Sequence, residues 1–228
     1  MNTWVIIPAA GSGERMKVDV PKVFLKIGDW PVIVHALDAF EKCSLIDGII
    51  LVGPEEHLKA LEGIVREAGF KKIRRVVAGG ATRTQSVRHG LKALDKDVDV
   101  VLVHDGARPL VTPAIIEESI KACSVSGAVV VAVPVKPTLK VVDPRTRVVS
   151  ETLDRTLVWE VQTPQVFKRE IIERAYGGDE NATDDAALVE RLGIPVSVCM
   201  GDHRNIKITT PEDLVIAEAL LRSRDTYH

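Results

Sequence analysis

The chain has 228 residues, 46% of them hydrophobic, which is enough to bury a sizeable core in one large domain. Its 30 basic and 32 acidic residues leave a formal net charge of -2 without a local basic stripe, which argues against a nucleic-acid partner. Three scattered cysteines argue against a disulfide framework, and the lack of an apolar run of roughly 18–20 residues or a signal-peptide pattern predicts a cytoplasmic protein without a membrane span.

Short runs of β-branched residues alternate with helical patterns through the first half of the chain. We expect strands at Trp4–Pro8, Gly48–Val52, Ile73–Val77, Val98–His104 and Ala128–Val133. Helices are expected between them, at Pro31–Cys43, Glu55–Ala68, Thr84–Leu94 and Pro113–Ser124. The near-continuous Val/Ile runs predict an α/β fold, a Rossmann-like and mostly parallel sheet with helices on both faces. Such sheets bind ligands beyond the carboxyl ends of their strands.

The alternation breaks between Val135 and Thr163. Two strand-like runs, 139–142 and 148–151, flank the turn sequence at 143–147. We interpret the segment at about 135–163 as a β-arm inserted into a single α/β domain that spans residues 1–228. Helices are expected again at Arg169–Tyr176, Thr183–Leu192 and Pro211–Arg222.

The loop after the first expected strand has the character of a phosphate site. Gly11 and Gly13 let the backbone approach a ligand closely, and Arg15 and Lys22 add positive charge. A dinucleotide loop would need a glycine where Met16 stands, and the Gly-Lys-Ser/Thr of a Walker A loop is absent. The alternative is an ordinary strand-to-helix turn, but such a turn would not need the two cations, so we favour the phosphate site.

Two further clusters follow expected strands. In Gly79–Ser86, the glycines allow a flat base to lie against the backbone and Ser86 can hydrogen-bond its edge, although a capped turn is the simpler alternative. In His104–Pro109, Asp105 is a candidate ligand for Mg²⁺ or a ribose, or else the cap of a turn. His104 has no second His or Cys at metal-ligand spacing, so we interpret it as a packed or orienting histidine.

Taken together, the motifs resemble one enzyme family, 2-C-methyl-D-erythritol 4-phosphate cytidylyltransferase of the non-mevalonate isoprenoid pathway. The resemblance extends from about Trp4 to about Arg222. It rests on residues 8–16 with Pro21-Lys22, Gly79–Ser86, His104–Pro109, Asp154-Arg155, Gln162–Gln165 and Asn205–Lys207.

The resemblance implies a reaction. CTP and methylerythritol phosphate would give CDP-methylerythritol and pyrophosphate with Mg²⁺ or another divalent cation, in a homodimer whose arm contributes across the interface. No metal ligand can be assigned from the motifs.

The resemblance also implies roles for individual residues. Catalytic roles would fall to Arg15, Lys22, Arg155 and Lys207. Nucleotide binding would fall to Ala9, Ala10, Gly11, Gly13, Gly80, Ser86 and Asp105. Asp105, Thr138, Arg155, Thr163 and Lys207 would line the substrate side.

One position departs from the family pattern, which often has an acid after the second glycine of the base-binding motif, where this chain has Ala81. Backbone carbonyls would then have to accept from the cytosine amino group. Three alternatives remain. A ribitol 5-phosphate cytidylyltransferase is expected to have a bulkier residue than Ala107. A non-catalytic nucleotide-binding regulatory protein would not need four separate cations, and an NAD-dependent dehydrogenase is disfavoured by Met16.

Overall fold

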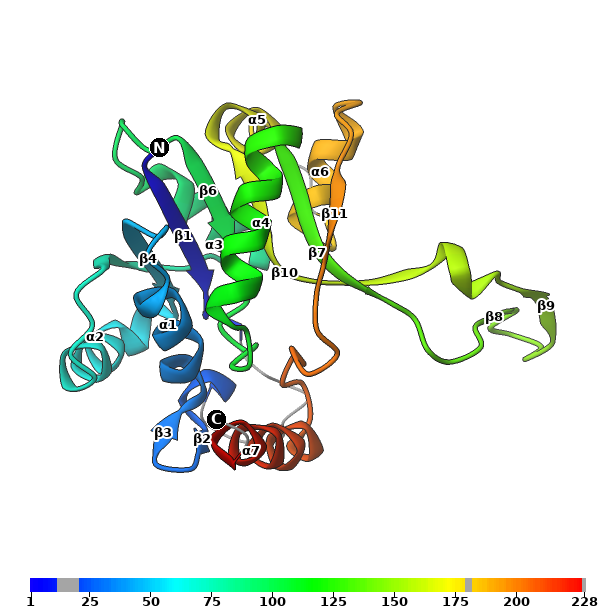
Figure 1. Cartoon of the computed structure of the whole chain (residues 1–228), viewed down its shortest axis with the longest axis horizontal. Coiled ribbons are helices and arrows are strands. Elements are labelled where there is room, and N and C mark those ends of the chain that lie inside the picture. Colours follow the sequence, from blue (N-terminus) through cyan, green and yellow to red (C-terminus); the bar gives the residue numbers. More distant parts are fainter. Residues whose placement is uncertain (12–20, 179–181, 227–228) are drawn as a thin grey trace.

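The computed structural model describes residues 1–11, 21–178 and 182–226, and these residues fold around a seven-stranded sheet (Figure 1). Its strands are β1 (Thr3–Pro8), β4 (Gly48–Gly53), β5 (Ile73–Ala78), β6 (Val100–Val103), β7 (Ala128–Pro134), β10 (Trp159–Lys168) and β11 (Ser197–Met200). The strand order is β11-β7-β10-β6-β1-β4-β5. β10 runs antiparallel to β6 and β7, and the other neighbouring pairs are parallel. The predicted mostly parallel α/β sheet is confirmed.

Helices cover both faces of this sheet. They are α1 (Val32–Lys42), α2 (Leu58–Glu67), α3 (Arg83–Lys92), α4 (Pro113–Ser126), α5 (Arg169–Ala175), α6 (Asp185–Arg191) and α7 (Pro211–Thr226). Val5 and Ile7 of β1 pack with side chains of α1, α2 and α4, whereas Trp4 and Ile6 pack with those of α3, α5 and α6. Because both faces of the strand are buried, its sequence is continuously apolar.

The last helix lies apart from these two layers. α7 packs beside the small hairpin of β2 (Lys26–Ile27) and β3 (Trp30–Pro31), below the sheet in Figure 1. Ile27, Ile208 and Ala217 are buried in the cluster between them. Among the described residues, no helix is both long and apolar enough to cross a membrane.

A hairpin projects sideways from the ends of β7 and β10 (Figure 1). It contains β8 (Lys140–Val142) and β9 (Val149–Thr152), which pair antiparallel, followed by a 3₁₀ turn at Arg155–Leu157. The two strand-like runs expected from the sequence are therefore confirmed. β10 starts at Trp159, within the range expected for the arm, so the final residues of that range belong to the main sheet.

Two sheet strands, β10 and β11, were not expected from the sequence. β10 contains Pro164 and the polar residues Gln162, Thr163 and Gln165, which are atypical of a central strand. Its pairing with β7 is interrupted between Val161 and Gln165, and this irregularity accommodates the proline. β11 is a four-residue strand at the sheet edge, too short to show a pattern.

Candidate active site

A cavity of about 390 Å³ opens at the carboxyl ends of three parallel strands. Its walls come from the loops after β1, β5 and β6, together with Lys22 and Lys207. A second cavity of about 360 Å³ adjoins it, because Arg83, Asp105 and Lys207 line both. Ligand sites of parallel α/β sheets lie at this edge, so the fold places the cavity where a substrate is expected.

The loops after β1 and β5 pack tightly against each other at one wall. A Cβ atom on Gly79 would lie only 2.4 Å from the Cβ of Ala10, so this approach requires a glycine. Gly80 donates its backbone N–H to the Ser86 hydroxyl at 3.1 Å, and that hydroxyl donates to the carbonyl of Thr82 at 3.0 Å. Ser86 therefore holds the shape of the glycine loop from the first turns of α3.

The charged centre of the site is Asp105, directly after β6. Arg83 Nε donates to Asp105 Oδ1 at 2.9 Å, and Lys207 Nζ lies 2.6 Å from Oδ2. Burial opposes ionisation of this carboxyl, but the charges of Arg83 and Lys207 outweigh it and hold the pKa of Asp105 well below its usual range. Asp105 is thus a permanent anion with a cation on each oxygen.

Arg83 is fixed from its other side by the first residue of α6. Its two terminal nitrogens donate to Asp185 Oδ1 and Oδ2 at 3.0 and 2.7 Å, a bidentate fork. Asp185 is fully buried and also accepts from the Tyr176 hydroxyl at 2.5 Å. Burial and then the Asp185 charge raise the pKa of Tyr176 far above its usual range, so the phenol stays a neutral donor.

A chain of neutral hydrogen bonds supports the backbone of Asp105. The Thr163 hydroxyl accepts from the Asp105 N–H at 3.1 Å and lies 3.0 Å from His104 Nδ1. His104 Nε2 lies 3.1 Å from the Arg108 carbonyl, which can only accept, so Nε2 carries the proton and Nδ1 accepts from Thr163. Burial lowers the pKa of His104 to about 4, which agrees with this neutral form. The expectation of a packed, orienting histidine is confirmed.

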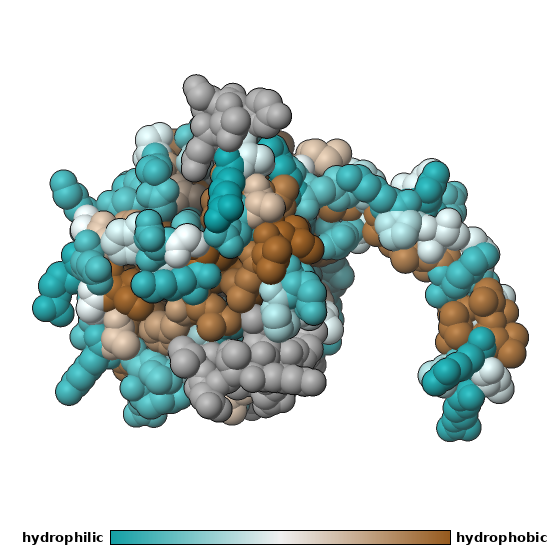
Figure 2. Space-filling view, turned by 90° about the horizontal axis from the view of Figure 1, so that it is seen from below, coloured by the Kyte–Doolittle hydropathy of each residue, from teal (hydrophilic) through white to brown (hydrophobic). Residues whose placement is uncertain are grey.

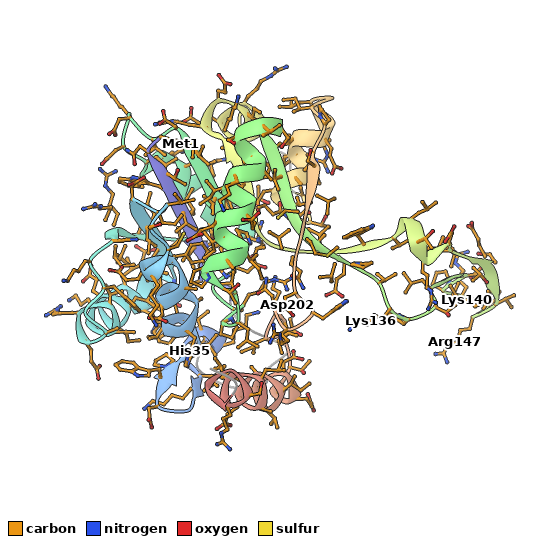
Figure 3. The ribbon with its side chains drawn as sticks, in the orientation of Figure 1. Met1, His35, Lys136, Lys140, Arg147 and Asp202 are labelled. Atoms are coloured by element: carbon orange, nitrogen blue, oxygen red, sulfur yellow. The ribbon has the colours of Figure 1, made fainter. Side chains whose placement is uncertain are left out.

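Most of the residues expected at the site come together there. The first cavity is lined by Ala9, Ala10, Gly11, Lys22, Gly80, Ser86, Asp105 and Lys207, and the second by Thr163. Thr138 and Arg155 lie on the projecting arm and line neither cavity of their own chain. Arg155 there donates to the Lys136 carbonyl at 3.0 Å, and Figure 3 shows Lys136 on the arm, outside the sheet. Gly13 and Arg15 lie outside the described residues.

Sequence reasoning missed two charged residues of this centre. Arg83 lies within the Gly79–Ser86 motif, whose interpretation gives it no role, and no motif includes Asp185. An arginine at the first position of a helix after a glycine loop is a usable signal, because its charge is unfavourable at the helix N-terminus unless an acid compensates it.

The described residues show no cluster of three or more His, Cys, Asp or Glu side chains that could hold a metal ion. Asp105 lines both cavities. Each of its carboxylate oxygens already forms an ion pair, one with Arg83 and the other with Lys207.

The sheet, the glycine loops at its carboxyl edge and the cations around them define a nucleotidyltransferase-like protein. Residues 3–223 match the family model of 2-C-methyl-D-erythritol 4-phosphate cytidylyltransferase, and the chain belongs to this family. A relative of that name from Alkaliphilus metalliredigens is 47% identical over 227 residues, covering 96% of this chain and 93% of the relative. Another, from Desulforamulus reducens, is 46% identical over 231 residues and covers 99% of this chain and 98% of the relative.

Solved structures agree with the family assignment. The 4-diphosphocytidyl-2C-methyl-D-erythritol synthase of Anaerococcus prevotii superposes with a TM-score of 0.86 at 35% identity, covering 97% of this chain and 96% of that one. The 2-C-methyl-D-erythritol 4-phosphate cytidylyltransferase of Thermus thermophilus superposes with a TM-score of 0.78 at 32% identity, covering 97% and 100%.

Proposed function

We propose that this enzyme transfers a cytidylyl group from CTP to 2-C-methyl-D-erythritol 4-phosphate, giving CDP-methylerythritol and pyrophosphate in the non-mevalonate route to isoprenoids. The observation that carries the proposal is the match to this family over nearly the whole chain, together with the cavity formed by the loops after β1, β5 and β6. Because CTP is a cytoplasmic metabolite, the proposal also places the enzyme in the cytoplasm.

The chemistry suits a site without a general base. A phosphate oxygen of the acceptor attacks the α-phosphorus of CTP, the bond from that phosphorus to the bridging oxygen breaks, and pyrophosphate leaves. The attacking oxygen is already ionised at neutral pH, so no proton has to be removed. The site must instead bring two anions into line and neutralise their charge. His104, neutral and buried, acts in this scheme only on the backbone of Asp105.

The cations are assigned by their place around the cavity. Lys22 stands beside the loop after β1, where the triphosphate would lie, and Lys207 faces the second cavity, where the acceptor phosphate would lie. Mg²⁺, held by phosphate oxygens, would supply further charge neutralisation. Thr163 would act on the acceptor side indirectly, because its hydroxyl holds the backbone of Asp105 at the wall of the second cavity.

The arm supports an active homodimer. It exposes large apolar side chains, among them Val142, Val148, Val149 and Leu157, with exposed fractions of 44%, 63%, 51% and 80%. Figure 2 shows hydrophobic residues gathered toward the end of the arm, away from the body. A two-stranded hairpin is marginally stable alone, so these residues need a partner surface. A second copy of the chain would supply it and receive Thr138 and Arg155 at its own cavity.

The proposal is tested by measuring pyrophosphate release from each of the four ribonucleoside triphosphates with each of two acceptors, methylerythritol phosphate and ribitol 5-phosphate. We expect turnover with CTP and methylerythritol phosphate that requires a divalent cation. A higher kcat/KM with ribitol phosphate would overturn the acceptor assignment. Absence of turnover with every triphosphate would overturn the proposed reaction.

A further inference from the structure

The two cations on Asp105 are held very differently. Arg83 makes three charged hydrogen bonds, one to Asp105 and two to Asp185, and its side chain is 26% exposed. Among the residues that the structure describes, Lys207 makes one ion pair, to Asp105 Oδ2, and its side chain is 34% exposed at the wall of both cavities. Arg83 is therefore fixed within the fold, whereas the Lys207 ammonium can turn toward a ligand.

In the proposed reaction, the Lys207 ammonium must move from Asp105 to the acceptor phosphate. A substrate phosphate that binds Lys207 competes with Asp105 for the same ammonium. A buried carboxylate that loses its only cation is strongly destabilised, and this cost would oppose phosphate binding. Asp105 does not face this cost, because Arg83 remains on Oδ1 when Lys207 leaves Oδ2.

We propose that Arg83, clamped by Asp185, is a positioning residue that keeps Asp105 neutralised so that Lys207 can pass to the acceptor phosphate. The inference rests on the proposed function, since it concerns the acceptor of that reaction. Two further contacts make the clamp rigid. Asp185 accepts from Tyr176, and the backbone N–H of Asp185 donates to the Gln165 side chain at 3.1 Å.

The clamp has a kinetic consequence. Without Arg83, Asp105 would have Lys207 as its remaining close cation and would hold it more strongly. The KM for the acceptor should then rise, while the KM for CTP should change less. Removing the Asp105 charge as well should release Lys207 and restore the acceptor KM, even though kcat stays low.

The experiment uses variants that remove charges in pairs. Arg83→Gln together with Asp185→Asn removes opposite charges at once, so no buried carboxylate is left without a partner. Asp105→Asn is then added to this variant. The matched control is Arg75→Gln with Asp95→Asn, an exposed ion pair of 2.6 Å outside the site. Arg83→Lys is a second test, because lysine keeps the charge but lacks the fork. Folding is checked by circular dichroism and thermal unfolding.

We expect the acceptor KM to rise about tenfold or more in the Arg83–Asp185 variant, as for the loss of one charged hydrogen bond. Arg83→Lys should give a smaller rise, the control pair none, and Asp105→Asn should bring the KM back toward the wild-type value. A folded variant with an unchanged acceptor KM, or no recovery on adding Asp105→Asn, overturns the inference. Inactive wild-type enzyme in the same assay would instead count against the proposed function.

Discussion

In the proposed reaction, Lys22 would stand where negative charge develops on the triphosphate during transfer. Its side chain lines the cavity beside the loop after β1, four residues before the exposed Lys26. We expect Lys22→Ala to lower kcat about 10²–10³-fold with little change in KM, because a cation aimed at the transition state contributes mainly there. Lys26→Ala is the matched control and should leave both constants unchanged. An effect of Lys22→Ala on KM alone would show uniform binding instead. Arg15→Ala is expected to behave as Lys22→Ala does.

Ala81 stands where the resemblance leads us to expect an acidic residue. It is exposed and lines the cavity beside Gly80. We expect Ala81→Asp to leave the preference for CTP over UTP intact or to sharpen it, because a carboxylate can accept from the cytosine amino group and repels the uracil carbonyl. Ala81→Asn has a similar size without the charge and serves as the control. The measurement is kcat/KM for both triphosphates, and a weaker preference in Ala81→Asp would show that residue 81 does not face the base.

His104 makes stability depend on pH. Its pKa is lowered to about 4 in the fold by burial, against 6.5 for an ordinary histidine. As pH falls below 6.5, His104 becomes protonated in the unfolded chain, whereas in the folded chain it stays neutral until about pH 4. The free energy of unfolding should therefore decrease through this window, by up to about 3 kcal/mol in total from this residue.

The pH prediction is checked by denaturant unfolding at a series of pH values from 7 to 4.5. His104→Gln should flatten the slope, whatever its effect on stability at pH 7, because the titrating group is gone. His203→Gln, at an exposed position, is the control and should keep the wild-type slope. Equal slopes in wild type and His104→Gln would contradict the assignment. Below about pH 4 the free energy of unfolding should continue to decrease, because the unfolded chain protonates Asp105 while the depressed pKa keeps this carboxylate ionised in the fold.

At the scale of elements, the contact between α3 and β1 positions the glycine loop that precedes α3. A Cβ on Gly90 of α3 would lie 2.4 Å from Ile6 Cγ2, inside the buried core. Gly90→Ala should therefore destabilise the fold by about 1–3 kcal/mol through overpacking, despite the better helix propensity of alanine. Gly63 of α2 is exposed with no atom near its Cβ position, so Gly63→Ala should stabilise by up to about 1 kcal/mol. Denaturant midpoints of the two variants should move in opposite directions.

The elements also show what sequence can and cannot predict here. Strands buried on both faces, such as β1 and β4, are continuously apolar and could be placed to within a residue or so. β10 could not, because its buried polar side chains are satisfied by partners distant in sequence. Gln162 donates to the Asp202 carbonyl at 2.9 Å and Gln165 to Asp184 at 3.0 Å. Hydrogen bonds of this kind leave no local pattern, so the strand is visible only once the sheet is assembled.

The same limit applies to the site. Its glycine loops and single cations were predictable because each follows an apolar strand or belongs to a motif of the family. The Arg83–Asp185 fork joins residues 102 positions apart, so although Arg83 at a helix start indicates that an acid must compensate it, the sequence does not indicate which acid. Long-range ion pairs depend on how α3 and α6 pack on the same face of the sheet, which no local pattern encodes.

At the scale of the whole molecule, the arm is the feature that a single chain leaves unexplained. Figure 3 shows Lys140 and Arg147 far from the body, at the outer part of the arm. Trp159 and Val161 at its base, together with Val198 and Met200 of the edge strand β11, are also exposed. Exposed apolar side chains on both the arm and the sheet favour the proposal that a second copy of this chain, related by a two-fold axis, covers them.

A composite site built from two chains predicts complementation between inactive variants. Lys22→Ala and Arg155→Ala should each be nearly inactive alone, since Lys22 lines its own chain's cavity and Arg155 is proposed to reach the partner's. In a mixed dimer one site carries both defects and the other none, so activity should return to about half per heterodimer. Mixing Lys22→Ala with Lys207→Ala is the control: both residues line the same cavity, so every site keeps one defect and activity should stay low. If heterodimers form and the first mixture stays inactive, Arg155 acts within its own chain and the composite site is wrong.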